Sequence, residues 1–171
     1  MDLKEQLRHV MDFPKPGVDF IDITTALINP EAFHETISQM QKQVEDVDFD
    51  LIIGSESRGF IMGAPLAYSM HKGFVPVRKK GKLPYKTVSV AYELEYGEDQ
   101  LEMHVDAVKP GQKVIVVDDL LATGGTALAT CKLVEKLGGE VAGVLFFIEL
   151  ASEFNGREVL GDYKVFSLAQ F

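Results

Sequence analysis

The stretch VIVVDDLLATGGTA, residues 114–127, decides the fold class of this chain. Four β-branched residues form a short buried strand, two adjacent aspartates follow it, and a loop of small residues leads into an apolar segment with helical spacing. In a parallel α/β sheet, ligands bind beyond the carboxyl ends of the strands, where loops lead into helices. Asp118 and Asp119 therefore stand where a bound ligand can compensate for two adjacent negative charges.

The rest of the chain repeats this alternation of strand and helix. We predict further buried strands at residues 51–53, 74–77 and 141–148, and helices at residues 31–45, 59–71 and 125–137. Because the strands are apolar throughout, they fit a parallel sheet that is covered on both faces. The sequence therefore predicts an α/β fold with a mostly parallel sheet flanked by helices.

One segment, residues 86–106, departs from this pattern. Apolar residues alternate with others on both sides of the turn YGEDQ, which predicts a β-hairpin with one wet face that projects from the sheet. The loop before it, RKKGKLPYK at residues 78–86, holds five basic residues in nine positions. In an acidic protein such a loop favours binding of an anion, although a solvated loop between strands has the same composition.

Composition limits the function classes. With 171 residues, 46% of them hydrophobic, the chain forms one domain over residues 1–171. A net charge of −9 argues against a nucleic-acid partner. A single cysteine, Cys131, excludes an internal disulfide framework, and we predict that it is inert in the core. No apolar run approaches the roughly 20 residues of a membrane span, and the N-terminus does not resemble a secretory signal. We expect a cytoplasmic protein that does not bind membranes.

The loop after the aspartate pair has the composition of a phosphate-binding loop. Small residues allow backbone N–H groups to approach an anion at the start of a helix. The chain lacks both the lysine of a Walker A loop and a GxGxxG motif, so neither a nucleotide triphosphatase nor a dinucleotide-binding protein fits. Carboxylates that accept hydrogen bonds from vicinal hydroxyls, beside a phosphate site, suit a ribose 5-phosphate. One aspartate as a simple helix cap is the alternative, but two adjacent acids followed by TGGT exceed what a cap needs. The candidate phosphoribosyl-binding residues are Asp118, Asp119, Ala122, Thr123, Gly124, Gly125 and Thr126.

The stretch VVDDLLATGGTA resembles the phosphoribosyl pyrophosphate signature of type I phosphoribosyltransferases. Four more stretches resemble, in order and spacing, the adenine phosphoribosyltransferases within that family: FPKPGVDFIDIT (13–24), GSESRGF (54–60), RKKGKLP (78–84) and YELEYG (92–97). The similarity covers nearly the whole chain. Some members have aspartate where this chain has Glu56, a change that keeps the charge.

This resemblance implies a type I phosphoribosyltransferase fold, with a small N-terminal hood from about residues 1–30 and a flexible loop and hairpin at about residues 78–106. It implies a purine-salvage enzyme that transfers the phosphoribosyl group of phosphoribosyl pyrophosphate to adenine, giving AMP and pyrophosphate. Mg²⁺ would arrive on the oxygens of phosphoribosyl pyrophosphate, without direct side-chain ligands. The family also implies a homodimer.

The resemblance further implies a pyrophosphate site. Its residues would be Glu56, Ser57, Arg58, Arg78, Lys79 and Lys82, with Arg58 also counted as catalytic. Arg58 follows the strand at residues 51–53, where a guanidinium and exposed amides can hold the anion; a plain surface charge is the alternative. We expect a non-proline cis peptide between Glu56 and Ser57. Closure of the basic loop would exclude water from the reacting ribose.

For the base, the resemblance places adenine under the hood. Phe20 would stack on the purine, Leu150 would pack on its other side, and the backbone around Asp19 and Ile21 would read its edge. Without the family, Phe20 is equally well a core residue.

The acid–base group is assigned to Glu95, which would interact with N7 of adenine and relay a proton, with Tyr96 as a loop-closing contact. Glu93 is two residues away and points the same way on a regular strand, so spacing alone does not choose between them. A solvated glutamate on the wet face is the alternative. Two rival functions stay open: a sister enzyme for another base, such as xanthine, and a non-catalytic regulator that senses phosphoribosyl pyrophosphate and binds DNA.

Overall fold

The computed structural model describes residues 1–93 and 96–171 of the chain. The N-terminal half contains a 3₁₀ turn Lys4–Gln6, β1 (Arg8–Met11), β2 (Asp19–Asp22), α1 (Thr24–Ile28), α2 (Pro30–Val44), β3 (Leu51–Ser55), α3 (Arg58–Ser69) and β4 (Gly73–Lys79). The C-terminal half contains β5 (Thr87–Glu93), β6 (Glu98–His104), β7 (Lys113–Leu121), α4 (Gly125–Lys136), β8 (Glu140–Glu149), α5 (Gly156–Leu160) and β9 (Val165–Gln170).

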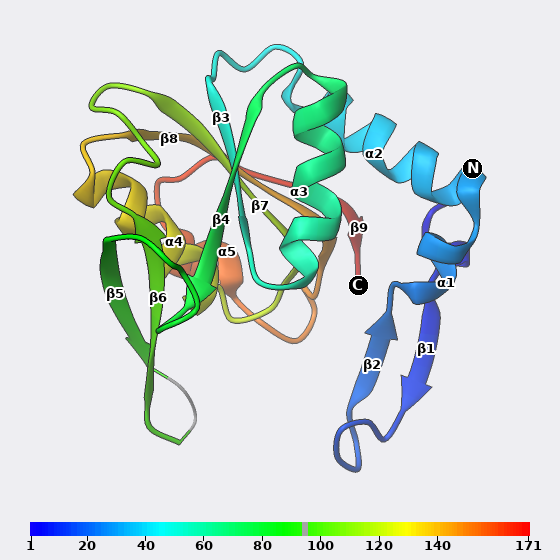
Figure 1. The fold of residues 1–171 in the computed structure, drawn as a ribbon. Helices are drawn as coiled ribbons and strands as arrows, with labels where there is room; N and C mark the ends of the chain where they lie inside the picture. The colour runs from blue at the N-terminus through cyan, green and yellow to red at the C-terminus, as the bar shows by residue number, and fades with distance from the viewer. Residues whose placement is uncertain (94–95) are drawn as a thin grey trace.

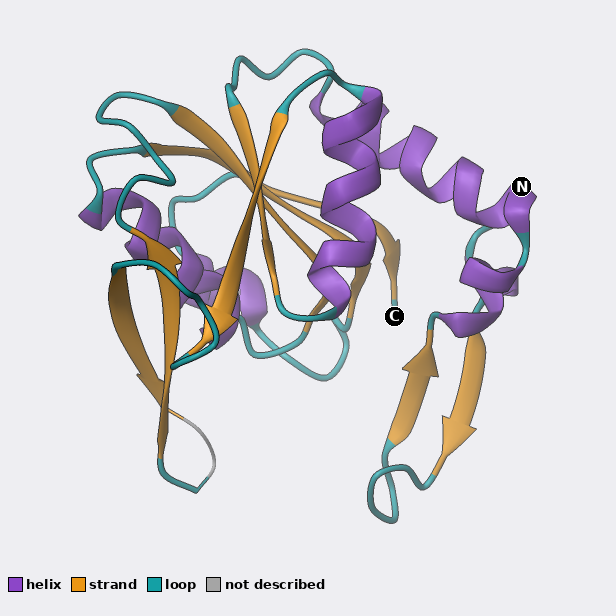
Figure 2. Ribbon diagram, viewed as in Figure 1, coloured by secondary structure: helices purple, strands orange, loops and turns teal. Residues whose placement is uncertain are grey.

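The main sheet is mostly parallel, as the sequence predicts. Its described strands follow the order β5-β6-β4-β3-β7-β8-β9. All neighbours from β4 to β9 run parallel, whereas β6 pairs antiparallel with β4 and with β5. Helices α2 and α3 cover one face and α4 and α5 the other, which gives three layers (Figures 1 and 2). The prediction of an α/β fold is confirmed, and the predicted hairpin forms an antiparallel extension of the sheet edge.

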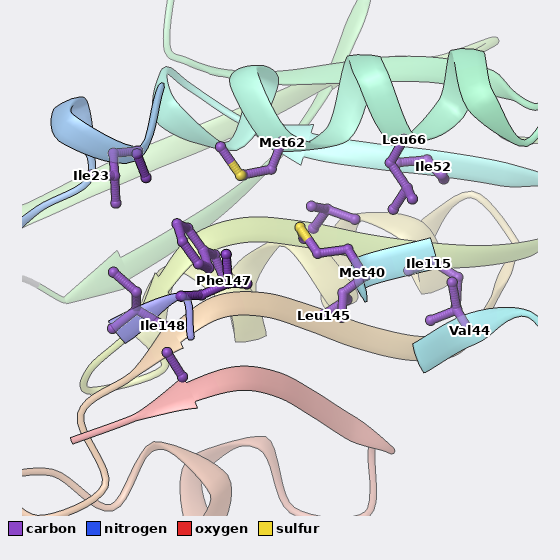
Figure 3. Close-up of a cluster of buried hydrophobic side chains, with 14 of the residues drawn as sticks. Ile23, Met40, Val44, Ile52, Met62, Leu66, Ile115, Leu145, Phe147 and Ile148 are labelled. Carbon is purple, nitrogen blue, oxygen red and sulfur yellow. The ribbon is translucent and has the colours of Figure 1, made fainter. Parts of the chain in front are cut away.

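Successive residues of strand β3 enter two different cores. On β3, Ile52 packs in the core under α2 and α3, where Figure 3 shows it with Met40 and Leu66. Its neighbour Ile53 packs in the opposite core, together with Cys131 of α4. Because side chains alternate across a strand, a sheet covered on both faces needs apolar residues at every position. This is the physical reason for the continuous apolar runs in the sequence.

Strand β7 is longer than its apolar run suggests. The sequence predicts a strand that stops at Val117, before the two aspartates. In the structure, pairing with β3 ends at Val117, but pairing with β8 continues to Leu121. Asp118 and Asp119 therefore stand on a strand that has lost one of its two neighbours. A hydropathy pattern does not detect this arrangement, because it depends on how far the adjacent strand reaches.

Several short elements were not anticipated from the sequence. Strand β9 completes the sheet beyond β8, and β1 pairs with β2 in a separate antiparallel ladder within the segment assigned to the hood. These strands are partly exposed and their burial does not alternate clearly, so neither periodicity marks them. Strand β6 already begins at Glu98, within the YGEDQ stretch that the sequence assigned to the turn. Helix α2 begins one residue earlier than predicted, at Pro30, where the Asn29 side chain accepts the N–H groups of Glu31 and Ala32.

The β1–β2 ladder and the β5–β6 hairpin extend from the same side of the main sheet, near its two ends (Figure 1). This is the side on which β3 and β4 end and the loops into the helices begin. The two projections therefore flank the carboxyl edge of the sheet. Across residues 1–93 and 96–171, no helix combines the length and hydropathy that a membrane crossing requires.

Candidate active site

A pocket of about 430 Å³ opens at the carboxyl edge of the sheet. It is bounded by the loop after β3, the end of β7 and the start of α4. The structure thus brings together two sequence motifs that lie about 60 residues apart, as strand order in a parallel sheet requires. The residues lining it are Glu56, Ser57, Arg58, Asp118, Asp119, Leu120, Leu121, Ala122, Thr123, Gly124, Gly125, Thr126, Ala127 and Phe146.

The two aspartates are held in different ways. Ser55 Oγ donates to Asp118 Oδ2 at 2.7 Å, and the backbone N–H of Asp119 donates to Asp118 Oδ1 at 2.8 Å. Asp119 is buried, with 7% of its side chain exposed, and its Oδ2 lies 2.8 Å from Nε of Arg58. A side chain on Gly59 would crowd this arrangement, because a Cβ there would lie 3.1 Å from Asp118 Oδ1.

Burial makes both carboxylates unusually basic. Desolvation, reinforced by the neighbouring charge of Asp119, raises the pKa of Asp118 above its ordinary value. Desolvation also raises the pKa of Asp119, although the Arg58 guanidinium opposes this shift. Carboxyl groups with pKa values raised by burial are typical of ligand sites, where hydroxyl donors from a ligand can stabilise the ionised form.

The loop from residue 122 to residue 126 forms the floor of the pocket and ends in α4. Gly124 has a φ of 87°, and α4 begins at the next residue. A Cβ built on Gly124 would lie 3.0 Å from the Gly156 carbonyl oxygen, so both conformation and space require glycine there. On Gly125, a Cβ would meet only Thr123 Oγ1, at 4.0 Å. The first N–H groups of a helix lack intrahelical acceptors, so this open loop can bind an anion.

The basic loop is tied to the loop after β3 by Glu56. Its side chain is 9% exposed; Oε2 accepts from Lys82 Nζ at 2.8 Å and lies 3.7 Å from Arg78 Nη2, while Oε1 accepts the N–H of Lys79. Burial acts to raise the pKa of Glu56, but the hydrogen bonds from Lys82 Nζ and from the Lys79 N–H, together with the charges of Lys82 and Arg78, outweigh it and lower the pKa, so the group is ionised at neutral pH. The Glu56–Ser57 peptide is cis, as predicted. Three of the candidate pyrophosphate residues are therefore gathered around one carboxylate.

The residues expected to bind the base lie beside this pocket rather than in its lining, as far as the described residues show. The Phe20 ring lies 5.8 Å from the Arg58 guanidinium and packs edge-on against Phe13 at 5.2 Å. The N–H of Leu150 donates to the carbonyl of Leu121, a lining residue, at 2.9 Å. Phe20 and Leu150 thus each contact a different residue of the pocket lining, and their role in base binding stays a prediction.

The other two hood residues have different surroundings. Asp19 Oδ2 lies 2.7 Å from His9 Nδ1, and Ile21 is buried in the core. The Ile21 side chain and one oxygen of Asp19 are therefore engaged by the protein, whereas Asp19 Oδ1 is buried without a hydrogen-bond partner among the described residues. The backbone of β2 remains the group predicted to read the base.

Two predictions concern the hairpin tip. Glu95 lies outside the described residues, so its role stays a prediction. Tyr96 is described and is 89% exposed. Elsewhere, Cys131 is buried in the core and burial raises the pKa of its thiol to about 12, in agreement with the prediction that it is inert. Residues 1–93 and 96–171 contain no cluster of three or more histidine, cysteine, aspartate or glutamate side chains arranged to hold a metal ion.

Sequence reasoning missed part of the pocket. Ser55 binds Asp118, and Leu120, Leu121, Ala127 and Phe146 complete the lining, yet no role was assigned to any of them. Ser55 stands in the quoted motif GSESRGF, so its position before the cis peptide was the available signal. The apolar residues carry no signal of their own, because they read as ordinary members of buried strands and a helix.

Comparison with known proteins agrees with this geometry. The family model described as "Phosphoribosyl transferase domain" matches residues 25–167. Among curated relatives, adenine phosphoribosyltransferases of Ruminiclostridium cellulolyticum and Acetivibrio thermocellus are 66% and 63% identical over 172 residues, with full coverage of both chains in each case.

Solved structures give the same result. Adenine phosphoribosyltransferase of Thermoanaerobacter pseudethanolicus superposes with a TM-score of 0.95 at 53% identity, covering 99% of this chain and 98% of that one. The Saccharomyces cerevisiae enzyme, solved with adenine and an imino-altritol bisphosphate, has a TM-score of 0.90 at 40% identity, covering 96% of this chain and 95% of that one. The chain belongs to the phosphoribosyl transferase domain family, within which it is a member of the adenine phosphoribosyltransferases.

Proposed function

We propose that this protein transfers the phosphoribosyl group of phosphoribosyl pyrophosphate to adenine, producing AMP and pyrophosphate in purine salvage. The observation that carries the proposal is the single pocket that joins an aspartate pair, a guanidinium and a phosphate-binding loop. Relatives that match the full chain at 63–66% identity carry this activity in their names. Adenine is the base in the yeast structure described above.

The proposal gives each part of the pocket one portion of the substrate. Asp118 and Asp119 accept hydrogen bonds from the two ribose hydroxyls, and these charge-assisted bonds offset the cost of their burial. The 5-phosphate binds the N–H groups of the loop formed by Ala122, Thr123, Gly124, Gly125 and Thr126. Arg58 lies next to Asp119 and so stands between the ribose and the leaving pyrophosphate.

Pyrophosphate binding is assigned to Ser57 and Arg58 together with Arg78, Lys79 and Lys82 of the basic loop. Glu56 contributes indirectly, because its carboxylate is an anion and its own N–H already donates to the Val77 carbonyl. It gathers the cations that the pyrophosphate needs. Mg²⁺ enters bound to phosphoribosyl pyrophosphate, and it neutralises part of the phosphate charge. This fits a pocket in which both oxygens of Asp118 and one oxygen of Asp119 already have partners, namely Ser55, a backbone amide and Arg58.

In the reaction, the bond from the ribose carbon to pyrophosphate breaks and a bond to N9 of adenine forms, while the base loses a ring proton. Phe20 and Leu150 hold the purine between them, and the backbone at Asp19 and Ile21 reads its edge. Glu95 receives or relays the proton through N7. Tyr96 contributes a contact when the basic loop and hairpin close and exclude water.

A direct test measures the products. The protein is incubated with Mg²⁺, phosphoribosyl pyrophosphate and adenine, and AMP and pyrophosphate are quantified by chromatography. Equal amounts of AMP and pyrophosphate, and none without adenine, are expected. Binding of phosphoribosyl pyrophosphate without turnover would instead favour a sensor, although the net charge of −9 makes a DNA-binding regulator a poor fit.

The proposal includes a homodimer that acts in the cytoplasm, which rests on the family resemblance. Light scattering of the purified protein is expected to give twice the mass of the chain, and a mass equal to one chain would contradict the dimer.

A further inference from the structure

An ion pair between a buried carboxylate, Glu149, and a half-exposed arginine, Arg157, lies outside the pocket and joins the last three elements of the chain. Glu149, 4% exposed, is the final residue of β8. Arg157 of α5 donates to both of its oxygens, from Nε at 2.7 Å and from Nη2 at 2.9 Å. Ser167 Oγ and Gln170 Nε2 of β9 also donate to Oε2, at 2.6 and 3.2 Å. The mechanism proposed above uses none of these groups.

The arginine also fixes the direction of α5. Its Nη1 donates to the Val165 carbonyl at 3.1 Å, so the guanidinium is held by β8 and β9 together. Bidentate pairing of this kind restricts orientation as well as distance. Because Arg157 is the second residue of α5, the pair determines where the first turn of that short helix lies.

The first turn of α5 supports the phosphate-binding loop from behind. A Cβ on Gly156 would lie 2.5 Å from the Ala122 carbonyl oxygen and 2.6 Å from Leu121 Cδ1, so the two backbones are in close contact. Gly124, in turn, is backed by the Gly156 carbonyl and by the Val159 side chain. Contacts therefore run without a gap from the ion pair through α5 to the loop at residues 122–126.

We propose that the Glu149–Arg157 ion pair is a positioning element for the 5-phosphate: it holds α5 against the loop at residues 122–126, and thereby sets that loop for a phosphate monoester. The inference deepens the proposed function and rests on its assignment of the loop. It predicts selectivity for the 5-phosphate, because α5 packs behind the phosphate loop, whereas the residues proposed for pyrophosphate lie between the end of β3 and the start of α3, at the end of β4 and in the loop after β4.

The test compares two ligands in three variants. Dissociation constants of ribose 5-phosphate and of pyrophosphate with Mg²⁺ are measured by calorimetry for the parent, Arg157→Lys, Glu149→Gln and Ser167→Ala. Arg157→Lys keeps the charge and loses the two-bond geometry, so its affinity for ribose 5-phosphate should fall about tenfold. Glu149→Gln should behave similarly and Ser167→Ala more mildly, whereas pyrophosphate affinity should stay within about twofold of the parent.

The matched control is Lys113→Gln, which breaks an ion pair with Asp48 at the opposite end of β7. This variant should bind both ligands like the parent. Equal losses for both ligands, or unchanged ribose 5-phosphate affinity in folded variants, would overturn the inference. Failure of all three variants to fold would assign the pair to folding alone and also overturn it. A parent that binds ribose 5-phosphate but does not turn over contradicts the proposed function and leaves this comparison valid; a parent that does not bind ribose 5-phosphate contradicts both.

Discussion

At the scale of single residues, Asp118 and Asp119 are placed to bind a ligand, and their burial lowers the stability of the folded protein. Both carboxylates are removed from water, and burial raises the pKa of each. Only Asp119 has a cationic partner among the described residues, Arg58 at 2.8 Å. The ribose hydroxyls of the proposed substrate would add further donors to those that Ser55, Arg58 and a backbone amide already supply.

Replacing both aspartates by asparagine tests this assignment. Each lost charge-assisted bond costs about 1.5–3 kcal/mol, so the double variant should lose about a hundredfold or more in kcat/KM. Steady-state kinetics provide the measurement and circular dichroism confirms the fold. Near-normal kinetics in a folded double variant would exclude the ribose role.

The raised pKa of Asp118 also predicts how stability depends on pH. Between the ordinary value of 3.8 and the raised value, the native protein holds a proton that the unfolded chain releases, so the free energy of unfolding decreases as pH rises. Asp118→Asn removes this proton. Urea unfolding at about pH 5 and about pH 8 should show a smaller loss of stability in the variant than in the parent. If the two proteins lose equal stability across this interval, the native state does not hold this extra proton on Asp118.

The acid–base assignment predicts different outcomes for two neighbouring glutamates. Glu95→Gln should lower kcat by roughly 10²–10⁴, with a smaller effect on affinity for phosphoribosyl pyrophosphate. Glu93→Gln is the control and should be mild. The opposite ranking would mean that Glu93 is the relevant group, and two mild variants would mean that the proton leaves to water.

At the scale of elements, the sequence predicted those strands and helices whose burial produces a clear hydrophobic pattern. The strands around Ile52 and Val116 and the helix containing Cys131 were predicted because apolar runs and three-residue spacing report burial directly. Strand β9 was missed because its burial is intermediate over most of its length. The extension of β7 to Leu121 depends on contacts with β8 that lie far away in sequence.

The sequence likewise predicted one part of the candidate site and its surroundings and missed another. Asp118, Asp119, Arg58 and the small-residue loop were predicted because charged and glycine-rich motifs stand out at strand ends. The ion pair of Glu149 and Arg157 was not, since eight residues separate two common residue types and nothing local shows that they meet.

The phosphate-binding loop offers a prediction with a control one residue away. Gly124→Ala forces a side chain into a left-handed conformation with φ of 87° and should lower the free energy of unfolding by about 1–2 kcal/mol. Gly125→Ala should leave stability near that of the parent, because its Cβ would have open space. Thermal or urea unfolding measures both. Equal stabilities would show that the loop tolerates a side chain at residue 124.

For the whole molecule, the fold explains why one small domain can assemble this chemistry. The parallel strands β3 and β7 bring their loops to one edge, while the β1–β2 ladder and the β5–β6 hairpin project on either side of it (Figure 1). The proposal places the base against the hood and Leu150, and the pyrophosphate against Ser57, Arg58 and the basic loop before the hairpin. In this proposal, the contacts that choose the base are separate from the ribose-phosphate site.

The most direct test of the account is base selectivity in a single assay. Pyrophosphate release is followed with Mg²⁺ and phosphoribosyl pyrophosphate while adenine, guanine, hypoxanthine and xanthine are supplied in turn. The account predicts turnover with adenine and little with the other three bases. Comparable or faster turnover with xanthine, guanine or hypoxanthine would contradict it, because the shared ribose-phosphate site would then serve a different base.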